Sequence, residues 1–229
     1  MNMPTTRPSF EIRLLWPALL MCVAAWAFLK VTGEVLEGDT RALDLWILQL
    51  LRHGEQQLQP IGPTWFQEAM RDLTALGSPA VLVLMVGAAW GYLLMARQWA
   101  MSWLALGSTG GGVLVAMILK ALFSRARPDA VFHATVASGY SFPSGHAMMS
   151  AVVYLTLGAL VARLAPRLRL RVYVMVAAIV LTGLVGLSRI YLGVHWASDV
   201  VAGWTAGTAW ALLCWLLAHK LKLGREDSQ

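Results

Sequence analysis

Charged residues are scarce in this chain of 229 residues. Asp, Glu, Lys and Arg make up 13% of the sequence and hydrophobic residues 58%, whereas soluble domains average about 25% charged and about 45–50% apolar residues. Such a composition excludes an ordinary soluble protein and indicates a membrane protein. The length suits one domain or two small ones, and no break in the pattern of apolar runs divides the chain. We therefore treat 1–229 as a single membrane domain whose core spans about 14–218.

Cysteine and acidic residues are also few. The two cysteines, Cys22 and Cys214, lie inside separate apolar runs, and metal ligands normally come in closely spaced sets. We interpret both as small apolar residues. The 18 Lys and Arg residues outnumber the 12 acidic ones, which gives a net charge of +6. Nucleic-acid binding would require a basic stripe over a soluble core, but here the cations lie between apolar runs. We therefore predict no nucleic-acid partner.

Long uncharged runs are what the sequence has instead. Six stretches contain no Asp, Glu, Lys or Arg: 14–29, 78–96, 98–119, 146–162, 172–187 and 200–218. A helix needs roughly 17–25 residues to span a bilayer; four runs reach this length, and Lys30 and Arg171 can snorkel at the ends of the two shorter ones. Because backbone groups in hydrocarbon must hydrogen-bond internally, the runs should be helices. The sequence predicts an all-α, integral membrane six-helix bundle.

The first uncharged stretch, 14–29, has two interpretations. A basic residue, Arg13, precedes it, and Ala25-Trp26-Ala27 resembles a signal-peptide cleavage site. We favour a retained membrane anchor over a cleaved signal peptide. The topology of the other five helices is the same in both cases.

The positive charges predict the orientation. The short loop from Arg163 to Arg171 holds four arginines, and short basic loops stay in the cytoplasm. Both termini are then cytoplasmic, including the tail 219–229, and the first, third and fifth loops face outside. If the membrane is a bacterial inner membrane, these three loops face the periplasm.

The first outer loop, 31–77, has helical patterns of its own. Asp39-Thr40 is expected to cap a helix, and Pro63-Thr64 to begin a second one. The apolar stripe of the first comprises Leu43, Trp46, Ile47, Leu50 and Leu51. We predict amphipathic helices in the membrane interface; a small lid packed over the bundle is the alternative, and the two readings are compatible. Residues 72–74 are predicted to cap the next helix, and the alternative is that this segment helps to close the site.

Two polar clusters lie at the ends of the third and fourth runs. Lys120 and Arg127 are seven residues apart, so on a continuing helix both cations would face one way. The sequence Pro143-Ser144-Gly145-His146 begins the fourth helix, where free amides and the helix dipole favour an anion. Each cluster alone has a plainer reading: Lys120 and Arg127 as interfacial anchors, and His146 as a polar boundary residue.

A third cluster lies between the fifth and sixth runs. It consists of Ser188-Arg189, His195 and Asp199, and a helical turn from 195 to 199 would place the carboxylate beneath the imidazole. Alone, this pair reads equally well as a structural hydrogen bond. All three clusters, however, fall on outward-facing loops. Three cations without neighbouring acidic partners favour a multiply charged oxyanion, and phosphate fits best.

The three clusters together resemble a known signature. Lys120-x6-Arg127-Pro128, Pro143-Ser144-Gly145-His146 and Ser188-Arg189-x5-His195-x3-Asp199 are similar, in order, to the three-part motif of the type 2 phosphatidic acid phosphatase family. That family shares its site with vanadium haloperoxidases and some bacterial acid phosphatases. Because all three parts match, the resemblance is far more specific than any one part.

The resemblance implies a role for each signature residue. His195 would be the nucleophile that becomes a phosphohistidine, Asp199 would hold its imidazole in the correct tautomer, and His146 would protonate the leaving oxygen. The phosphoryl oxygens would be held by Lys120, Arg127, Ser144, Gly145 and Arg189. Fixed cations can supply the charge that magnesium supplies in kinases, so we predict no metal and no cofactor. Arg125, outside the signature, would contact substrate or solvent.

The resemblance also implies a substrate class. A site at the membrane surface suits a lipid phosphate: undecaprenyl diphosphate, phosphatidate, phosphatidylglycerophosphate or lipid A, with membrane lipids around it. Three alternatives remain: a lipid phosphotransferase using the same residues, a vanadate-dependent haloperoxidase, against which the six spans argue, and a non-catalytic lipid-binding or transport protein. The glycine-rich run 107–112 lacks the Gly-Lys-Ser/Thr ending of a P-loop and is expected to allow close helix packing.

Overall fold

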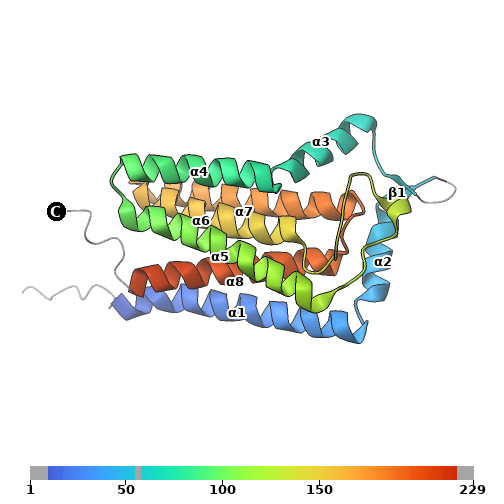
Figure 1. Ribbon diagram of the computed structural model, residues 1–229, viewed down its shortest axis with the longest axis horizontal. Coiled ribbons are helices and arrows are strands. Elements are labelled where there is room, and N and C mark those ends of the chain that lie inside the picture. Colours follow the sequence, from blue (N-terminus) through green and yellow to red (C-terminus); the bar gives the residue numbers. More distant parts are fainter. Residues whose placement is uncertain (1–9, 55–57, 221–229) are drawn as a thin grey trace, which may run out of the picture.

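The computed structural model describes residues 10–54 and 58–220, with side chains from Leu14 onward. Its elements are α1 (Phe10–Glu37), α2 (Arg41–Leu50), β1 (Arg52–His53), β2 (Gln59–Pro60), α3 (Thr64–Ala75), α4 (Pro79–Met95), α5 (Trp99–Phe123), the 3-10 helix η1 (Ala130–Phe132), α6 (Gly145–Leu164), α7 (Leu168–Tyr191) and α8 (Ala197–Lys220). The long helices run side by side, and α2 and α3 lie at one end of the bundle (Figure 1). The chain is thus all-α apart from the two-residue antiparallel pair β1–β2.

The membrane-spanning helices agree with the prediction of six spans. Within the described residues, α1, α5, α6, α7 and α8 are long and apolar enough to cross a bilayer. The sixth span is a bent pair, in which α3 and α4 meet at 49°. The bend lies at Gly77–Ser78, where Ser78 caps α4 by accepting a hydrogen bond from the amide of Val81 at 3.4 Å. The predicted cap at 72–74 is therefore wrong, because those residues form the last turns of α3.

Helix α6 is the centre of the bundle. Over half of its apolar window, 56%, is buried, against 6–33% for the other four single spans. Its Val153 packs with Leu82 of α4 and Val185 of α7 in the largest apolar cluster. Helix α6 begins at Gly145, directly after Ser144. The most buried of the single spans therefore carries one of the three predicted polar clusters at its start.

Glycines bring α6 and α8 into backbone contact. A Cβ on Gly203 would lie 2.7 Å from the carbonyl oxygen of Ser144, and one on Gly207 would lie 2.4 Å from that of Met148. In the run 107–112, Gly111 likewise leaves room for the Trp210 ring, whereas Gly107 and Gly110 have open space around them. Close packing thus explains only part of that run. The α6–α8 contact fixes the start of α6 against the start of α8.

The outer segment combines both expected arrangements. Helix α1 continues to Glu37, well beyond the predicted run. Thr40 precedes α2, but its side chain makes no capping bond, so the expected Asp39-Thr40 cap is not formed. On α2, Asp44 and Leu48 are buried against the bundle, while Leu43, Trp46 and Leu50 are exposed. The predicted apolar stripe is therefore divided: α2 covers the bundle end with one face and presents an apolar face outward.

Candidate functional site

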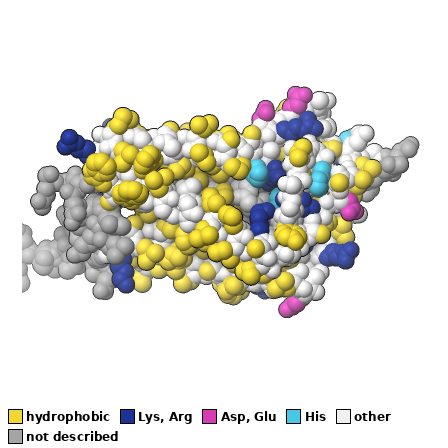
Figure 2. All heavy atoms as spheres, viewed as in Figure 1, with side chains coloured by type: hydrophobic (Ala, Val, Ile, Leu, Met, Phe, Trp, Pro, Cys, Tyr) yellow, Lys and Arg dark blue, Asp and Glu magenta, His cyan; other side chains and the backbone are white. Residues whose placement is uncertain are grey.

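The three signature clusters meet at the end of the bundle covered by α2 and α3. Lys120 lies in the last turn of α5, His146 in the first turn of α6, and Arg189 in the last turn of α7. His195 lies between α7 and α8, and Asp199 in the first turn of α8. Cationic and histidine side chains gather toward this end of the surface, beyond an apolar band (Figure 2). Residues up to 79 positions apart in sequence therefore belong to one site.

His195 is held between Asp199 and Arg127. Its Nδ1 lies 3.5 Å from Asp199 Oδ2, at the outer limit of a hydrogen bond, and its Nε2 lies 3.0 Å from Arg127 Nη1. A guanidinium can only donate, so Nε2 is the acceptor and the ring proton is on Nδ1, facing the carboxylate. Burial is the main cause that lowers the pKa of His195 to about 4, while Asp199 acts in the opposite direction. The imidazole is therefore neutral near pH 7, and its Nε2 lone pair accepts from Arg127.

The His195–Asp199 pair is not the helical turn that its spacing suggested. Helix α8 begins at Ala197, so His195 precedes it. Asp199 instead reaches back along the helix start, where its Oδ2 accepts from the amide of Trp196 at 3.0 Å. A carboxylate that bonds an amide three residues earlier is half of a capping box. Asp199 Oδ2 thus both caps the start of α8 and faces His195 Nδ1.

Arg127 connects the loops around the site. Its guanidinium donates to the carbonyl oxygens of Ser138 (2.9 Å), Gly139 (3.0 Å) and Val194 (2.6 Å). Burial lowers its pKa, but a guanidinium remains charged at any ordinary pH. The chain does not continue as a helix from Lys120 to Arg127, because α5 ends at Phe123 and Ser124 is left-handed with φ +35°. The expected helical alignment of the two cations is therefore wrong.

Lys120 and Arg127 converge nevertheless, through the loop that follows. Lys120 Nζ donates to the carbonyl oxygen of Tyr140 at 3.1 Å, and Arg127 Nη2 donates to the same oxygen at 3.3 Å. A Cβ on Gly145 would lie 3.4 Å from Lys120 Cε and 4.0 Å from its Nζ. The ammonium group thus lies directly over the first turn of α6, where helix amides have no intrahelical partner.

Arg189 and His146 complete the cationic cluster. Arg189 is 5% exposed, and its Nη1 donates to Thr74 Oγ1 of α3 at 3.0 Å. Its Nε is buried without a hydrogen-bond partner among the described residues, so a donor is free. His146 lies within electrostatic range of Arg189, His195, Lys120 and Arg127. A ligand that satisfies these groups must be an anion with several acceptor oxygens.

Ser144 has a visible structural role. It is fully buried and precedes α6, with its Oγ 3.5 Å from the amide of Ala147. Its own amide donates to the carbonyl oxygen of Asp199 at 2.9 Å. The start of α6 is thereby bonded to the start of α8. Its predicted contact with phosphate stays a prediction.

Three residues that the sequence analysis did not assign to the site also contact it. Arg125, whose side chain is 18% exposed, bridges Asp199 and the buried Asp44 of α2. Thr74 holds Arg189, which agrees with the idea that α3 closes the site. One feature of the sequence could have indicated Asp44, because it is an acidic residue inside an apolar helical pattern. Among the described residues, no group of three or more His, Cys, Asp or Glu side chains forms a metal-binding cluster.

Comparisons with known proteins agree with this geometry. Residues 101–223 match the family model of the PAP2 superfamily. The chain is 34% identical over 167 residues to phosphatidylglycerophosphatase B of Bacillus subtilis, covering 71% of this chain and 80% of that protein. It is 38% identical over 69 residues to an undecaprenyl-diphosphatase of Sulfolobus acidocaldarius, covering 30% of this chain and 29% of that protein.

The structure supports the same assignment. A crystal structure of a transmembrane PAP2-type phosphatidylglycerolphosphate phosphatase from Bacillus subtilis superimposes with a TM-score of 0.70 at 27% identity, covering 90% of this chain and 96% of that one. The predicted family, the helical membrane fold and the prediction of a membrane lipid phosphatase are thereby confirmed at the level of the family. The chain is an integral membrane protein and belongs to the PAP2 superfamily.

Proposed function

We propose that this protein hydrolyses a lipid phosphate or diphosphate through a phosphohistidine on His195. The carrying observation is the 3.0 Å contact between Arg127 Nη1 and His195 Nε2. An anion oxygen that takes the place of His195 Nε2 as the acceptor of Arg127 Nη1 would bring its phosphorus next to the Nε2 lone pair. The neutral ring and the Nδ1 proton facing Asp199 are the state that a histidine nucleophile requires.

The reaction would proceed in two balanced steps. First, the negative charge of the bound phosphate offsets the surrounding cations and allows His146 to be protonated. His195 Nε2 then forms a bond to phosphorus while the bond from phosphorus to the lipid oxygen breaks, and His146 gives its proton to that oxygen. Second, His146 takes a proton from water, the hydroxide attacks phosphorus, and the P–N bond breaks to release inorganic phosphate. The positive charge that develops on His195 during the first step is balanced by Asp199. General acid–base catalysis of this kind typically contributes about 10²–10⁴-fold.

The cationic cluster would stabilise the transition state. Lys120, Arg127 and Arg189, with the amide of Gly145, would bind the three equatorial oxygens, and Ser144 would hold the start of α6 in place or bind an oxygen itself. Preorganised charge in a site shielded from water is the main catalytic resource in phosphoryl transfer. We therefore propose a reaction that needs no added metal.

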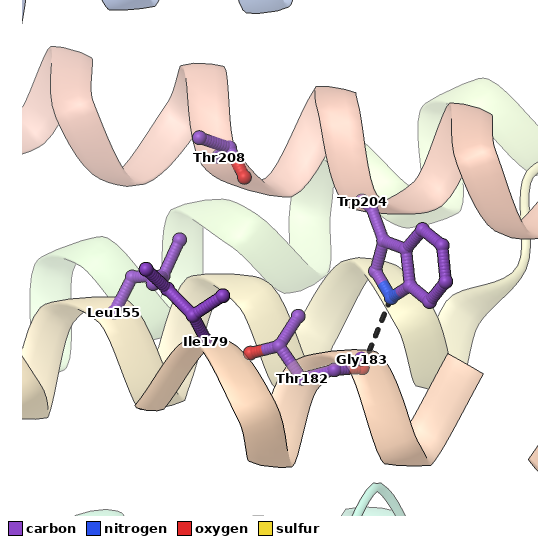
Figure 3. Close-up of a pocket in the computed structure, with 6 residues that line it drawn as sticks. All are labelled: Leu155, Ile179, Thr182, Gly183, Trp204 and Thr208. Atoms are coloured by element: carbon purple, nitrogen blue, oxygen red, sulfur yellow. Dashed lines mark hydrogen bonds between the residues drawn. The ribbon is translucent and has the colours of Figure 1, made fainter. Parts of the chain in front are cut away.

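The hydrocarbon part of the substrate would extend into the bundle. A groove of about 320 Å³ lies between α7 and α8 and is lined by Leu155, Ile179, Thr182, Gly183, Trp204 and Thr208 (Figure 3). It lies below the site: Gly183 is six residues before Arg189, or about 9 Å along α7. The Trp204 indole lines the groove and donates to the carbonyl oxygen of Thr182 at 3.0 Å. We propose that one prenyl or acyl chain occupies this groove.

The proposed location is the periplasmic side of a bacterial inner membrane. Arg97, Arg163, Arg167, Arg169 and Arg171 all lie at the end of the bundle opposite the site, as the positive-inside rule requires of a cytoplasmic end. Arg7, Lys222 and Arg225, which support the same orientation, lie outside the described residues. The names of related proteins favour phosphatidylglycerophosphate, undecaprenyl diphosphate and lipid A as candidate substrates.

A phosphate-release assay in detergent tests the proposed function. Purified protein would be offered undecaprenyl diphosphate, phosphatidate and phosphatidylglycerophosphate, each with and without a chelator. We expect phosphate release without added metal, inhibition by vanadate, and loss of activity in His195→Ala and His146→Ala. Release that stops with chelator, or that persists in His195→Ala, would contradict the proposal.

A further inference from the structure

A buried ionic chain runs from α2 into the catalytic pair. Arg125 Nη1 donates to Asp199 Oδ1 at 2.5 Å, and its Nη2 donates to Asp44 Oδ2 at 2.8 Å. The two carboxylates are 0% and 2% exposed, respectively, and the arginine side chain 18%. Two buried carboxylates therefore share one guanidinium, which lies behind Asp199 on the side away from His195.

Both carboxylate oxygens of Asp44 accept hydrogen bonds from Ser198 of α8. Its Oδ1 accepts from the amide of Ser198 at 2.9 Å, and its Oδ2 accepts from the hydroxyl of Ser198 at 2.6 Å. Arg125 Nη1 also donates to that hydroxyl at 2.8 Å. The α2 helix is thus attached to the first turn of α8, one residue before the carboxylate that faces His195.

This arrangement divides the two oxygens of Asp199 between two tasks. Oδ1 is held by Arg125, while Oδ2 accepts from the Trp196 amide and faces His195 Nδ1. If Arg125 were balanced by Asp199 alone, it would neutralise much of the charge that must support His195. Asp44 supplies a second negative charge, so that Asp199 keeps its own toward the imidazole.

We propose that Arg125 and Asp44 are positioning residues, which fix Asp199 so that its free oxygen supports His195 during formation of the phosphohistidine. This inference rests on the proposed function. It also makes α2 a part of the active site, although α2 lies about 150 positions before the catalytic pair. Neither residue contacts the phosphate position; both act through Asp199.

The test compares four variants of the full-length protein in detergent with one lipid phosphate. Asp44→Asn and Arg125→Met remove one member of the chain each. Asp39→Asn is the matched control for the first, because it makes the same change of charge at an exposed residue five positions earlier. Arg71→Met is the control for the second. Arg71 is an arginine of α3 at the same end of the bundle, and its Nε donates to the carbonyl oxygen of Ala134 at 3.0 Å.

We expect Asp44→Asn and Arg125→Met to lower kcat on the order of 10- to 100-fold, the effect typical of residues that orient a functional histidine from outside. KM should change little, because the phosphate-binding cations are untouched. The acid limb of the pH profile reports protonation of His195. In Arg125→Met, Asp199 loses its cation and raises the pKa of His195 further, so the limb should move to higher pH. In Asp44→Asn the limb should not move to higher pH. The other charged groups facing His195, namely Arg127, Arg189 and His146, are the same in both variants.

The outcomes separate the two proposals. Wild-type protein that releases no phosphate from any lipid would overturn the proposed function. Active wild-type protein with an Asp44→Asn variant equal to Asp39→Asn would overturn the positioning role while leaving the function intact. The same holds if Arg125→Met behaves like Arg71→Met, losing activity only in proportion to the folded protein and keeping the pH profile of the wild type. Activity normalised to folded protein, by Tm and gel filtration, excludes misfolding as the cause.

Discussion

The loop that carries His195 depends on the lack of a side chain at Gly193. Gly193 has φ +71°, and a Cβ there would lie 2.2 Å from the carbonyl oxygen of Phe132 and 2.3 Å from Arg52 Nη2. Both obstacles are fixed, because Arg52 Nη2 donates to that same oxygen at 3.1 Å and Nη1 to the carbonyl of Tyr191 at 2.9 Å. Gly193→Ala should therefore break the Arg52 clamp and displace the loop two residues before His195.

The magnitude follows from two contributions. An alanine in the left-handed region costs about 1–2 kcal/mol. Loss of one hydrogen bond from a buried charged donor adds about 1.5–3 kcal/mol, so the free energy of unfolding should fall by about 2.5–5 kcal/mol. Each kcal/mol lowers Tm by about 2–4 °C in a protein of this size, which gives a decrease of roughly 10 °C. A displacement of about 1 Å at His195 should also lower kcat about 10²-fold.

Gly38→Ala is the matched control. Gly38 has φ +87° but nothing within 4 Å of the position its Cβ would take, so it carries the backbone cost without the clash. Thermal unfolding in detergent and phosphate release would be measured for both variants. The reasoning would be refuted if Gly193→Ala lost no more stability than Gly38→Ala, or if it kept wild-type kcat.

Three other predictions concern the site and the groove. Because burial holds the pKa of His195 near 4, kcat should fall only as pH drops toward 4; a fall centred near 6.5 would contradict a buried nucleophile. Thr74→Val leaves a second buried donor of Arg189 unpaired, so it should weaken inhibition by vanadate or lower Tm. If neither quantity changes, the assigned contact is contradicted. Gly183→Leu should raise KM for long-chain more than for short-chain lipid phosphates, whereas Gly87→Leu, also with open space around it, should not; equal effects would argue against the groove.

The spans and the signature residues could be predicted from the sequence because each depends on local information. A run without charges in hydrocarbon must be a helix, so five single spans and the α4 half of the sixth were readable directly. The residues Lys120, His146 and His195 were found because their residue types and spacing match a specific motif. Neither inference required knowledge of how distant segments pack.

The contacts that orient the signature could not be predicted in the same way. Arg125 contacts Asp44, 81 positions earlier, and Arg189 contacts Thr74, 115 positions earlier. A buried Asp on α2 has no partner in its own helix, and only packing of α2 over the bundle end supplies one. The helical geometries assumed for Lys120 with Arg127, and for His195 with Asp199, were wrong for a related reason: α5 ends before Arg127, and α8 begins after His195.

The most direct test of the central claim is the capture of phosphate on His195. A His146→Gln variant should slow hydrolysis of the intermediate, which needs His146 as a base, more than its formation from a diphosphate, whose leaving group needs less protonation. Protein incubated with radiolabelled undecaprenyl diphosphate would be quenched in alkali, where phosphohistidine survives, and mapped by mass spectrometry. The account predicts phosphate on His195 and on no other residue, and none in a His195→Gln background. Turnover without any phosphorylated His195, or phosphate on another side chain, would contradict it.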